Sequence, residues 1–164
     1  MGIDLKNWMQ NLPDGSDLLA LNLCGTHDCV TQHIRLPHFF CCQDLTIYEQ
    51  LLLGVRALDI RVRADGKCLT MVHGIFPAYN HSCHRANLMD MGDVLSQCYR
   101  FLDECPGEAV VFQFKNDNGK ENEQCFDNLF YTYIKGKEPY WYLEDRVPTL
   151  GAARGKLVLI SRCK

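Results

Sequence analysis

Two histidines of this 164-residue chain lie where catalysis is favoured. His27 in CGTHD and His73 in VHG each follow a short apolar run with a glycine close by. Imidazole titrates near neutral pH, so two such side chains can act as general base and general acid. Asp28 adjoins the first histidine, and Arg61 offers a permanent planar cation for phosphate oxygens. Together the four residues predict cleavage of a phosphodiester without a metal ion.

Simpler structural roles exist for some of the same residues. Arg61 could form a salt bridge with Asp59 or Asp65, and Asp28 could cap the next segment. Each residue alone is therefore weak evidence, and the prediction rests on their joint chemistry.

Ten cysteines suggest a different interpretation, a zinc or redox site. The residues that would build it are Cys24, Cys29 and His27, or the NHSCH cluster of His81, Cys83 and His84. Structural zinc sites usually draw on paired cysteines at short spacing, whereas these cysteines are scattered. We therefore favour small buried apolar residues in a reducing compartment for most of them.

Short apolar runs alternate with amphipathic ones along the chain. The expected strands are 18–25, 56–62, 68–74, 108–117 and 155–164, and the expected helices are 45–55, 87–105 and 121–133. Strands that are apolar on both faces and alternate with helices predict a parallel sheet covered by helices. An Asp-Gly dipeptide between the second and third strands suggests a tight hairpin there.

Polar side chains gather at the expected carboxyl ends of these strands. They are His27 and Asp28, Arg61, His73, Lys115 and Arg162. In an α/β barrel that rim carries the active site, so their placement favours an enzyme.

Composition narrows the class of protein further. With 47% hydrophobic and 23% charged residues, the chain is expected to form one globular domain over 1–164. A net charge of −3 and scattered basic residues predict no nucleic-acid partner. The absence of a long apolar run predicts no transmembrane helix. The polar start MGIDLKNWMQNLPDG lacks the apolar core of a secretory signal.

Six segments resemble the X domain of bacterial-type phosphatidylinositol-specific phospholipase C. They are NWMQNLPD, CGTHD, CQDLTIYEQLLLGVRALDIRV, VHG, FLDECPGEAVVFQFK and LGAARGKLVLISR. The resemblance implies an α/β, TIM-barrel-like fold, here a partial barrel of about five parallel strands where a full barrel has eight. It also implies a reaction in which the inositol 2-hydroxyl of phosphatidylinositol displaces diacylglycerol and leaves a cyclic inositol phosphate.

Residue roles follow from the same resemblance. His27 matches the general base and His73 the general acid, while Asp28 matches the carboxylate paired with that acid. Arg61 matches the arginine that stabilises the phosphate. Cationic contacts to inositol are implied for Lys115 and Arg162. No metal or other cofactor is implied, because Arg61 stands where the calcium-dependent relatives carry acidic ligands.

One expected part has no counterpart in the sequence. Later strands of the family supply the carboxylate that orients the general-base histidine, and we find no candidate for it here. Three explanations stay open: a fragment, one half of a split barrel that associates through its open edges, or a catalytically impaired remnant that binds lipid or inositol.

The expected partner is the phosphatidylinositol headgroup, reached from a membrane surface. The aromatic stretch at 130–143, with Trp141, could rest at that surface or pack against the barrel exterior. Location stays open: the resemblance implies an extracellular protein, whereas the missing signal and the many cysteines fit a reducing cytosol.

Overall fold

The computed structural model describes residues 2, 4–65, 67–82, 87–117 and 123–162. Its strands are β1 (Gly25–Thr26), β2 (Ala57–Asp65), β3 (Cys68–His73), β4 (Phe76–Pro77), β5 (Val110–Asn116), β6 (Trp141–Tyr142) and β7 (Leu157–Ser161). Its α-helices are α1 (Pro37–Phe40), α2 (Ile47–Leu52), α3 (Met91–Glu104), α4 (Glu123–Ile134) and α5 (Leu150–Ala153). Four 3₁₀ helices, η1 (Leu5–Asn11), η2 (Leu18–Ala20), η3 (Thr31–His33) and η4 (Glu138–Tyr140), complete the described elements.

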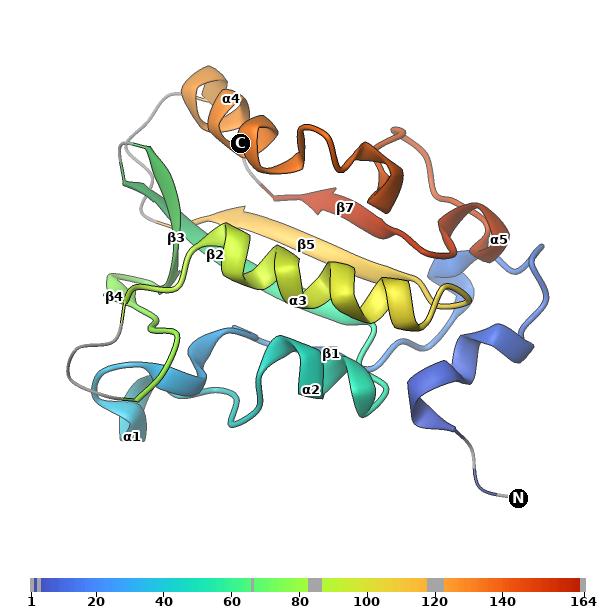
Figure 1. Ribbon diagram of the computed structural model, residues 1–164, viewed down its shortest axis with the longest axis horizontal. Helices are drawn as coiled ribbons and strands as arrows, with labels where there is room; N and C mark the ends of the chain where they lie inside the picture. The colour runs from blue at the N-terminus through green and yellow to red at the C-terminus, as the bar shows by residue number, and fades with distance from the viewer. Residues whose placement is uncertain (1, 3, 66, 83–86, 118–122, 163–164) are drawn as a thin grey trace.

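A seven-stranded mixed sheet organises the molecule (Figure 1). Its order is β4-β3-β2-β5-β7-β6, with β1 against β2. The pairs β1–β2, β2–β5, β5–β7 and β7–β6 are parallel, whereas β3 and β4 are antiparallel. The predicted hairpin between β2 and β3 is confirmed, with Asp65 opposite Cys68. The expected α/β fold with a partial barrel is confirmed, and the described strands do not close into a complete barrel.

The helices α2, α3 and α4 cover one face of this sheet (Figure 1). Leu58, Ile60 and Val62 alternate along β2 and are buried beneath them, because successive side chains of a strand point to opposite faces. Burying a side chain of this size stabilises a fold by about 1.5–3 kcal/mol. The opposite face of β2 carries Asp59 and Arg61, whose side chains therefore point away from the core beneath α2, α3 and α4.

Local sequence signals set where the main helices begin. Thr46 and Glu49 form a capping box at α2, and Asp90 and Asp93 form one at α3. Each box satisfies backbone N–H groups that the first helical turn leaves without partners. None of the described helices is long and apolar enough to cross a bilayer.

The strand expected over 18–25 is wrong. Asp17 accepts a hydrogen bond from the backbone N–H of Leu19 at 2.9 Å and starts the 3₁₀ helix η2 instead. Leu18 is buried with Met9 in a second, smaller core cluster, whereas Leu19 is 63% exposed. The sheet therefore gains only the two residues of β1 from this segment.

The aromatic stretch at 130–143 packs mainly inward. The rings of Phe130 and Trp141 meet at 5.7 Å, and both side chains are buried in the main core. The interpretation of Trp141 as a membrane anchor is wrong, because an indole inside the core cannot reach a bilayer.

Candidate active site

The register between β1 and β2 sets the position of the first histidine. Thr26 lies opposite Leu58, so His27 follows at the level of Asp59. The backbone N–H of Cys29 extends the contact, donating to the Asp59 carbonyl at 3.3 Å. His27 thus leaves the strand beside the polar face of β2.

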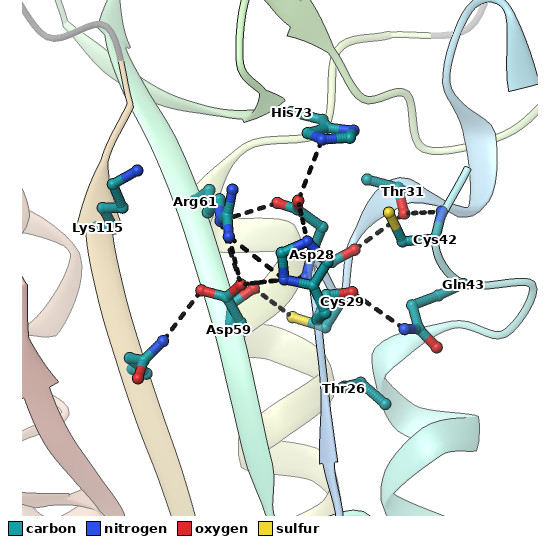
Figure 2. A network of polar contacts seen from close by, with 12 residues as sticks. Thr26, Asp28, Cys29, Thr31, Cys42, Gln43, Asp59, Arg61, His73 and Lys115 are labelled. Atoms are coloured by element: carbon teal, nitrogen blue, oxygen red, sulfur yellow. Dashed lines mark hydrogen bonds and ion pairs between the residues drawn. The ribbon is translucent and has the colours of Figure 1, made fainter. Parts of the chain in front are cut away.

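Asp28 lies at the centre of the cluster (Figure 2). Its side chain is fully buried, and its backbone has a φ of 44°, a left-handed conformation that aspartate tolerates better than most residues. Three cationic or titratable groups surround its two oxygens. Arg61 Nε lies 3.1 Å from Oδ1, His27 Nε2 lies 3.2 Å from Oδ2, and His73 Nε2 lies 3.4 Å from Oδ2. One buried carboxylate therefore joins both histidines and the arginine.

Asp59 faces the other nitrogen of the first histidine. Its Oδ2 lies 3.0 Å from His27 Nδ1 and also accepts hydrogen bonds from Arg61 Nη2 at 3.0 Å and the Asp28 backbone N–H at 3.3 Å. Gln113 Nε2 donates to Oδ1 at 3.2 Å. A carboxylate accepts a hydrogen bond, so this contact favours a hydrogen on Nδ1 and leaves Nε2 as the basic atom.

The sequence analysis missed this role of Asp59. Its alternation with Arg61 along the strand was the available signal, since residues two apart share a face. The sequence does not reveal the register between β1 and β2, which brings His27 alongside Asp59.

His73 ends β3 and is held from a different direction. Its Nδ1 lies 3.1 Å from the backbone carbonyl of Phe40, an oxygen that can only accept. The hydrogen therefore belongs on Nδ1, and Nε2 points to Asp28. The Phe40 ring meets the imidazole edge-on at 5.6 Å and fixes its plane.

The two carboxylates have opposite electrostatic environments. Burial raises the pKa of Asp28, and the nearby charges of Arg61, His73 and His27 offset part of that effect. Burial also acts on Asp59, but hydrogen bonds from Arg61 and the Asp28 backbone outweigh it and lower the pKa of Asp59. Asp59 is therefore the more firmly ionised of the two.

The two expected inositol contacts lie at the neighbouring strand ends. Lys115 lies opposite Arg61 in the β2–β5 register, and its ammonium pairs with Asp117. The backbone N–H of Arg162 donates to the Phe114 carbonyl at 2.7 Å. Arg162 also lines an open hollow of about 320 Å³ together with His27, Asp59 and Arg61. The structure thus brings His27, Asp28, Arg61 and His73 into contact and places Lys115 and Arg162 at the edge of that group.

Among the described residues, Cys24, Cys29 and His27 do not come together as the zinc interpretation suggested. The eight described cysteines are free thiols, and burial raises the pKa of Cys29 well above its usual range. Cys83 and His84 lie outside the described residues. Among the described residues, the cluster that could hold a metal ion is His27, Asp28 and Cys42.

Comparisons with known proteins find relatives along nearly the whole chain. The 1-phosphatidylinositol phosphodiesterase of Listeria monocytogenes is 28% identical over 170 residues, which cover 97% of this chain and 49% of that protein. The protein of the same name from Staphylococcus aureus strain Newman is 28% identical over 166 residues, covering 96% and 51%. No protein-family model matches the chain.

Solved structures give the same result. The phosphatidylinositol-specific phospholipase C from L. monocytogenes superposes with a TM-score of 0.79 at 28% identity, covering 98% of this chain and 58% of that one. The chain is therefore similar, over nearly its whole length, to the bacterial phosphatidylinositol-specific phospholipase C family. An S. aureus enzyme of this family, solved in work on its membrane binding, superposes with a TM-score of 0.80 over 98% of this chain.

The chain spans about half the length of the curated relatives it matches. The matched half of those relatives corresponds to the seven-stranded sheet with both histidines. Activity, substrate and partners are therefore argued for this chain from its own residues.

Proposed function

We propose that this chain cleaves phosphatidylinositol to diacylglycerol and a cyclic inositol phosphate without a metal ion. The observation that carries the proposal is the meeting of His27 Nε2 and His73 Nε2 at one buried carboxylate, Asp28 Oδ2. Arg61 lies against the same carboxylate and adds the cation that a phosphate needs. The substrate class comes from the bacterial relatives, which are 1-phosphatidylinositol phosphodiesterases.

Each step of the reaction has a residue in place. His27 Nε2 takes the proton of the inositol 2-hydroxyl, whose oxygen attacks phosphorus. The bond from phosphorus to the diacylglycerol oxygen breaks, and His73 gives that oxygen a proton. Arg61 holds the non-bridging oxygens as negative charge develops. Lys115 and Arg162 would contact the inositol ring from the adjacent strand ends.

We infer that Asp59 positions the general base. Its contact with His27 Nδ1 fixes the imidazole so that Nε2 presents a lone pair to the substrate. In this chain Asp59 would do the work that a carboxylate from a later strand does in the rest of the family. The expected gap in the catalytic group is thus filled from β2.

The catalytic proposal is tested with purified chain on vesicles containing phosphatidylinositol, followed by ³¹P NMR of the products. We expect cyclic inositol phosphate from the wild type and a loss of about 10²–10⁴-fold in rate for His27→Ala and His73→Ala. His33→Ala is the matched control, because that imidazole lies outside the cluster at η3. Unchanged turnover in His27→Ala would overturn the assignment. Vesicle binding by the wild type without any product would favour the alternative of an impaired lipid-binding remnant.

A second proposal concerns assembly, because one edge of the sheet is incompletely paired. The strand β6 pairs with Leu157 and Val158 of β7, and no described strand continues that pairing to Ser161. A groove of about 610 Å³ lies beside this edge, with Leu19, Leu143 and Ile160 among its walls. We propose that a second copy associates here, as open strand edges favour. Sedimentation equilibrium that gives a monomer at all accessible concentrations would exclude it.

A further inference from the structure

A thiol lies at the rim of the catalytic cluster without a role in the proposed reaction. Cys42 Sγ, a ring nitrogen of His27 and an oxygen of Asp28 all lie within 4.8 Å of one another. Thiolate, imidazole and carboxylate are the ligands that zinc prefers in proteins. We propose that His27, Asp28 and Cys42 form a Zn²⁺ site. The proposal goes beyond the reaction, which uses no metal.

The spacing of two ligand atoms already suits zinc. His27 Nε2 and Asp28 Oδ2 are 3.2 Å apart. A tetrahedral ion with bonds of about 2.0–2.1 Å requires about 3.3 Å between such atoms, and roughly 3.6 Å between either atom and a thiolate sulfur. Cys42 must therefore move by about 1 Å to close the site. Its side chain is exposed, and its Sγ makes a long 3.8 Å contact with the Phe40 carbonyl that a metal bond would replace.

The buried carboxylate is short of hydrogen bonds. Both oxygens of Asp28 are inaccessible to solvent, and neither accepts a hydrogen bond in the structure. Its contacts are ion pairs, and Arg61 approaches Oδ1 rather than Oδ2. A metal ion on Oδ2 would therefore displace His73 but leave Arg61 in place.

Hydrogen bonds around the site also position His27 and Cys42 to bind a metal ion. Asp59 holds His27 Nδ1, which leaves the Nε2 lone pair beside Asp28 Oδ2 for a metal ion, in the carboxylate–histidine arrangement that supports zinc ligands. The backbone N–H of Cys42 donates to Thr31 Oγ1 at 2.8 Å, and that hydroxyl donates to the Asp28 carbonyl at 2.9 Å (Figure 2). Two loops that carry ligands are thus tied together.

Zinc at this site would have a definite chemical effect. On binding, the Cys42 thiol releases its proton to solvent, and the thiolate joins Asp28 and Asp59 as three anionic groups against one guanidinium. The ion occupies the His27 lone pair that takes the substrate proton. Zn²⁺ would thus inhibit the enzyme, a consequence that rests on the proposed function although the site itself does not.

Metal binding by the full chain tests the site without any use of activity. Co²⁺ is titrated first, because a thiolate bound to it gives a near-ultraviolet charge-transfer band, and Zn²⁺ affinity is then measured by competition with a chromophoric chelator. We expect one equivalent and the thiolate band in the wild type. Cys42→Ser should lose the band and lose more affinity than the roughly tenfold that removal of an outer-shell partner costs.

Cys41→Ser is the matched control for that variant. Its thiol is the chain neighbour, but its Sγ contacts the Gln43 carbonyl at 3.2 Å and lies outside the cluster. It should keep both band and affinity. Equal Zn²⁺ affinity in the wild type and Cys42→Ser, or loss of the band in Cys41→Ser instead, would overturn the proposal.

A measurement on the wild type covers the case of a poorly folded variant. Alkylation of Cys42 by iodoacetamide, located by mass spectrometry, should slow when Zn²⁺ is present, whereas alkylation of exposed Cys24 should not. Equal protection of both thiols, or of neither, would contradict the site. If Zn²⁺ inhibits the wild type and Cys42→Ser relieves that inhibition, the zinc site also controls catalysis. If the metal-free chain is inactive, the proposed function is refuted, but the binding results still decide whether the zinc site exists.

Discussion

At the scale of single residues, the candidate site is organised by two carboxylates with different tasks. Asp28 is buried between the two histidines, whereas Asp59 contacts Nδ1 of His27 from the sheet. Despite the burial of Asp59, hydrogen bonds from Arg61 and the Asp28 backbone lower its pKa, and so keep an anion beside His27, the proposed general base. A neutral amide there could accept a hydrogen bond but could not stabilise an imidazolium.

Asp59→Asn is therefore expected to lower kcat far more than it changes KM. The equivalent change in a Ser-His-Asp triad costs on the order of 10⁴-fold, and we expect a loss approaching that size. Initial rates of cyclic phosphate release over a range of substrate concentrations measure the split. Asp65→Asn, on the same strand but paired with Arg63 at the surface, is the control. A variant at 59 with wild-type kcat would show that the contact does not orient His27.

The types of four site residues could be read from the sequence, but their partners could not. His27, Asp28, Arg61 and His73 carry the chemistry in their side chains and follow apolar runs. The role of Asp59 depends on a register set by the two-residue strand β1, which no periodicity reveals. The proximity of Cys42 likewise depends on how a loop folds back onto the strand end.

At the scale of elements, a buried ion pair joins the starts of β2 and β5. Arg56 Nη2 and Glu108 Oε2 are 2.7 Å apart, and both side chains are fully buried. Glu108 also accepts hydrogen bonds from the backbone N–H groups of Met9 and Gln10, so the same carboxylate holds η1 against the sheet. Such a pair is costly to break, because either partner alone leaves an unpaired buried charge.

Glu108→Gln is expected to reduce the free energy of unfolding by about 3–5 kcal/mol. The reason is that Arg56 keeps its charge at a fully buried position and loses the carboxylate that balances it. Urea unfolding followed by circular dichroism measures the change. Glu138→Gln, at the exposed start of η4, serves as the reference substitution. A loss below about 1 kcal/mol, the size typical of a surface pair, would mean that the pair is solvated.

A second contact between elements makes the stability of the fold depend on pH. Glu104 at the end of α3 accepts hydrogen bonds from Tyr48 Oη at 2.7 Å, Lys6 Nζ at 3.0 Å and Arg100 Nε at 3.1 Å. These three donors lower the pKa of Glu104 to about 2. Because the unfolded value is about 4.3, the stabilisation is complete above that pH and is lost as the pH falls towards 2.

Thermal melting at a series of pH values checks this dependence. We expect Glu104→Gln to melt below the wild type at pH 7 by an amount that stays constant down to about pH 4.3. Below that the two melting temperatures should converge gradually towards pH 2, where Glu104 takes up its proton in the folded state as well. A difference that persists unchanged to pH 2 would contradict the linkage.

The longer elements could be predicted from periodicity, and the strand that was predicted wrongly has a physical cause. β2, β5, β7 and α3 are long enough for an apolar pattern to specify one face. The segment 18–25 is apolar too, but Asp17 caps a 3₁₀ turn at its start, and Leu18 fills a space beneath the sheet. Apolar content alone does not distinguish a strand from a turn that buries one leucine.

At the scale of the whole molecule, an apolar rim stands beside the catalytic cluster. Leu36, Phe39 and Ile75 are 56%, 79% and 67% exposed. They lie on and around α1 and β4, at the end of the molecule towards which β5 and β7 point (Figure 1). The Phe40 carbonyl that holds His73 belongs to the same rim, so the proposed general acid is tied to the surface that would face lipid. Exposed apolar groups gathered at one site favour contact with a membrane.

Phe39→Ser is expected to weaken binding to phosphatidylinositol vesicles by roughly 10- to 100-fold, the equivalent of the 1.5–3 kcal/mol for burying a large apolar side chain. Vesicle co-sedimentation at several lipid concentrations measures the partition coefficient. Tyr131→Ser is the matched control, because that ring is 54% exposed within the aromatic stretch on α4. Its binding should stay close to that of the wild type. Equal losses of binding in both variants would show that the lipid contact is not confined to the apolar rim. A loss of binding only in Tyr131→Ser would place the contact on α4 instead of the rim.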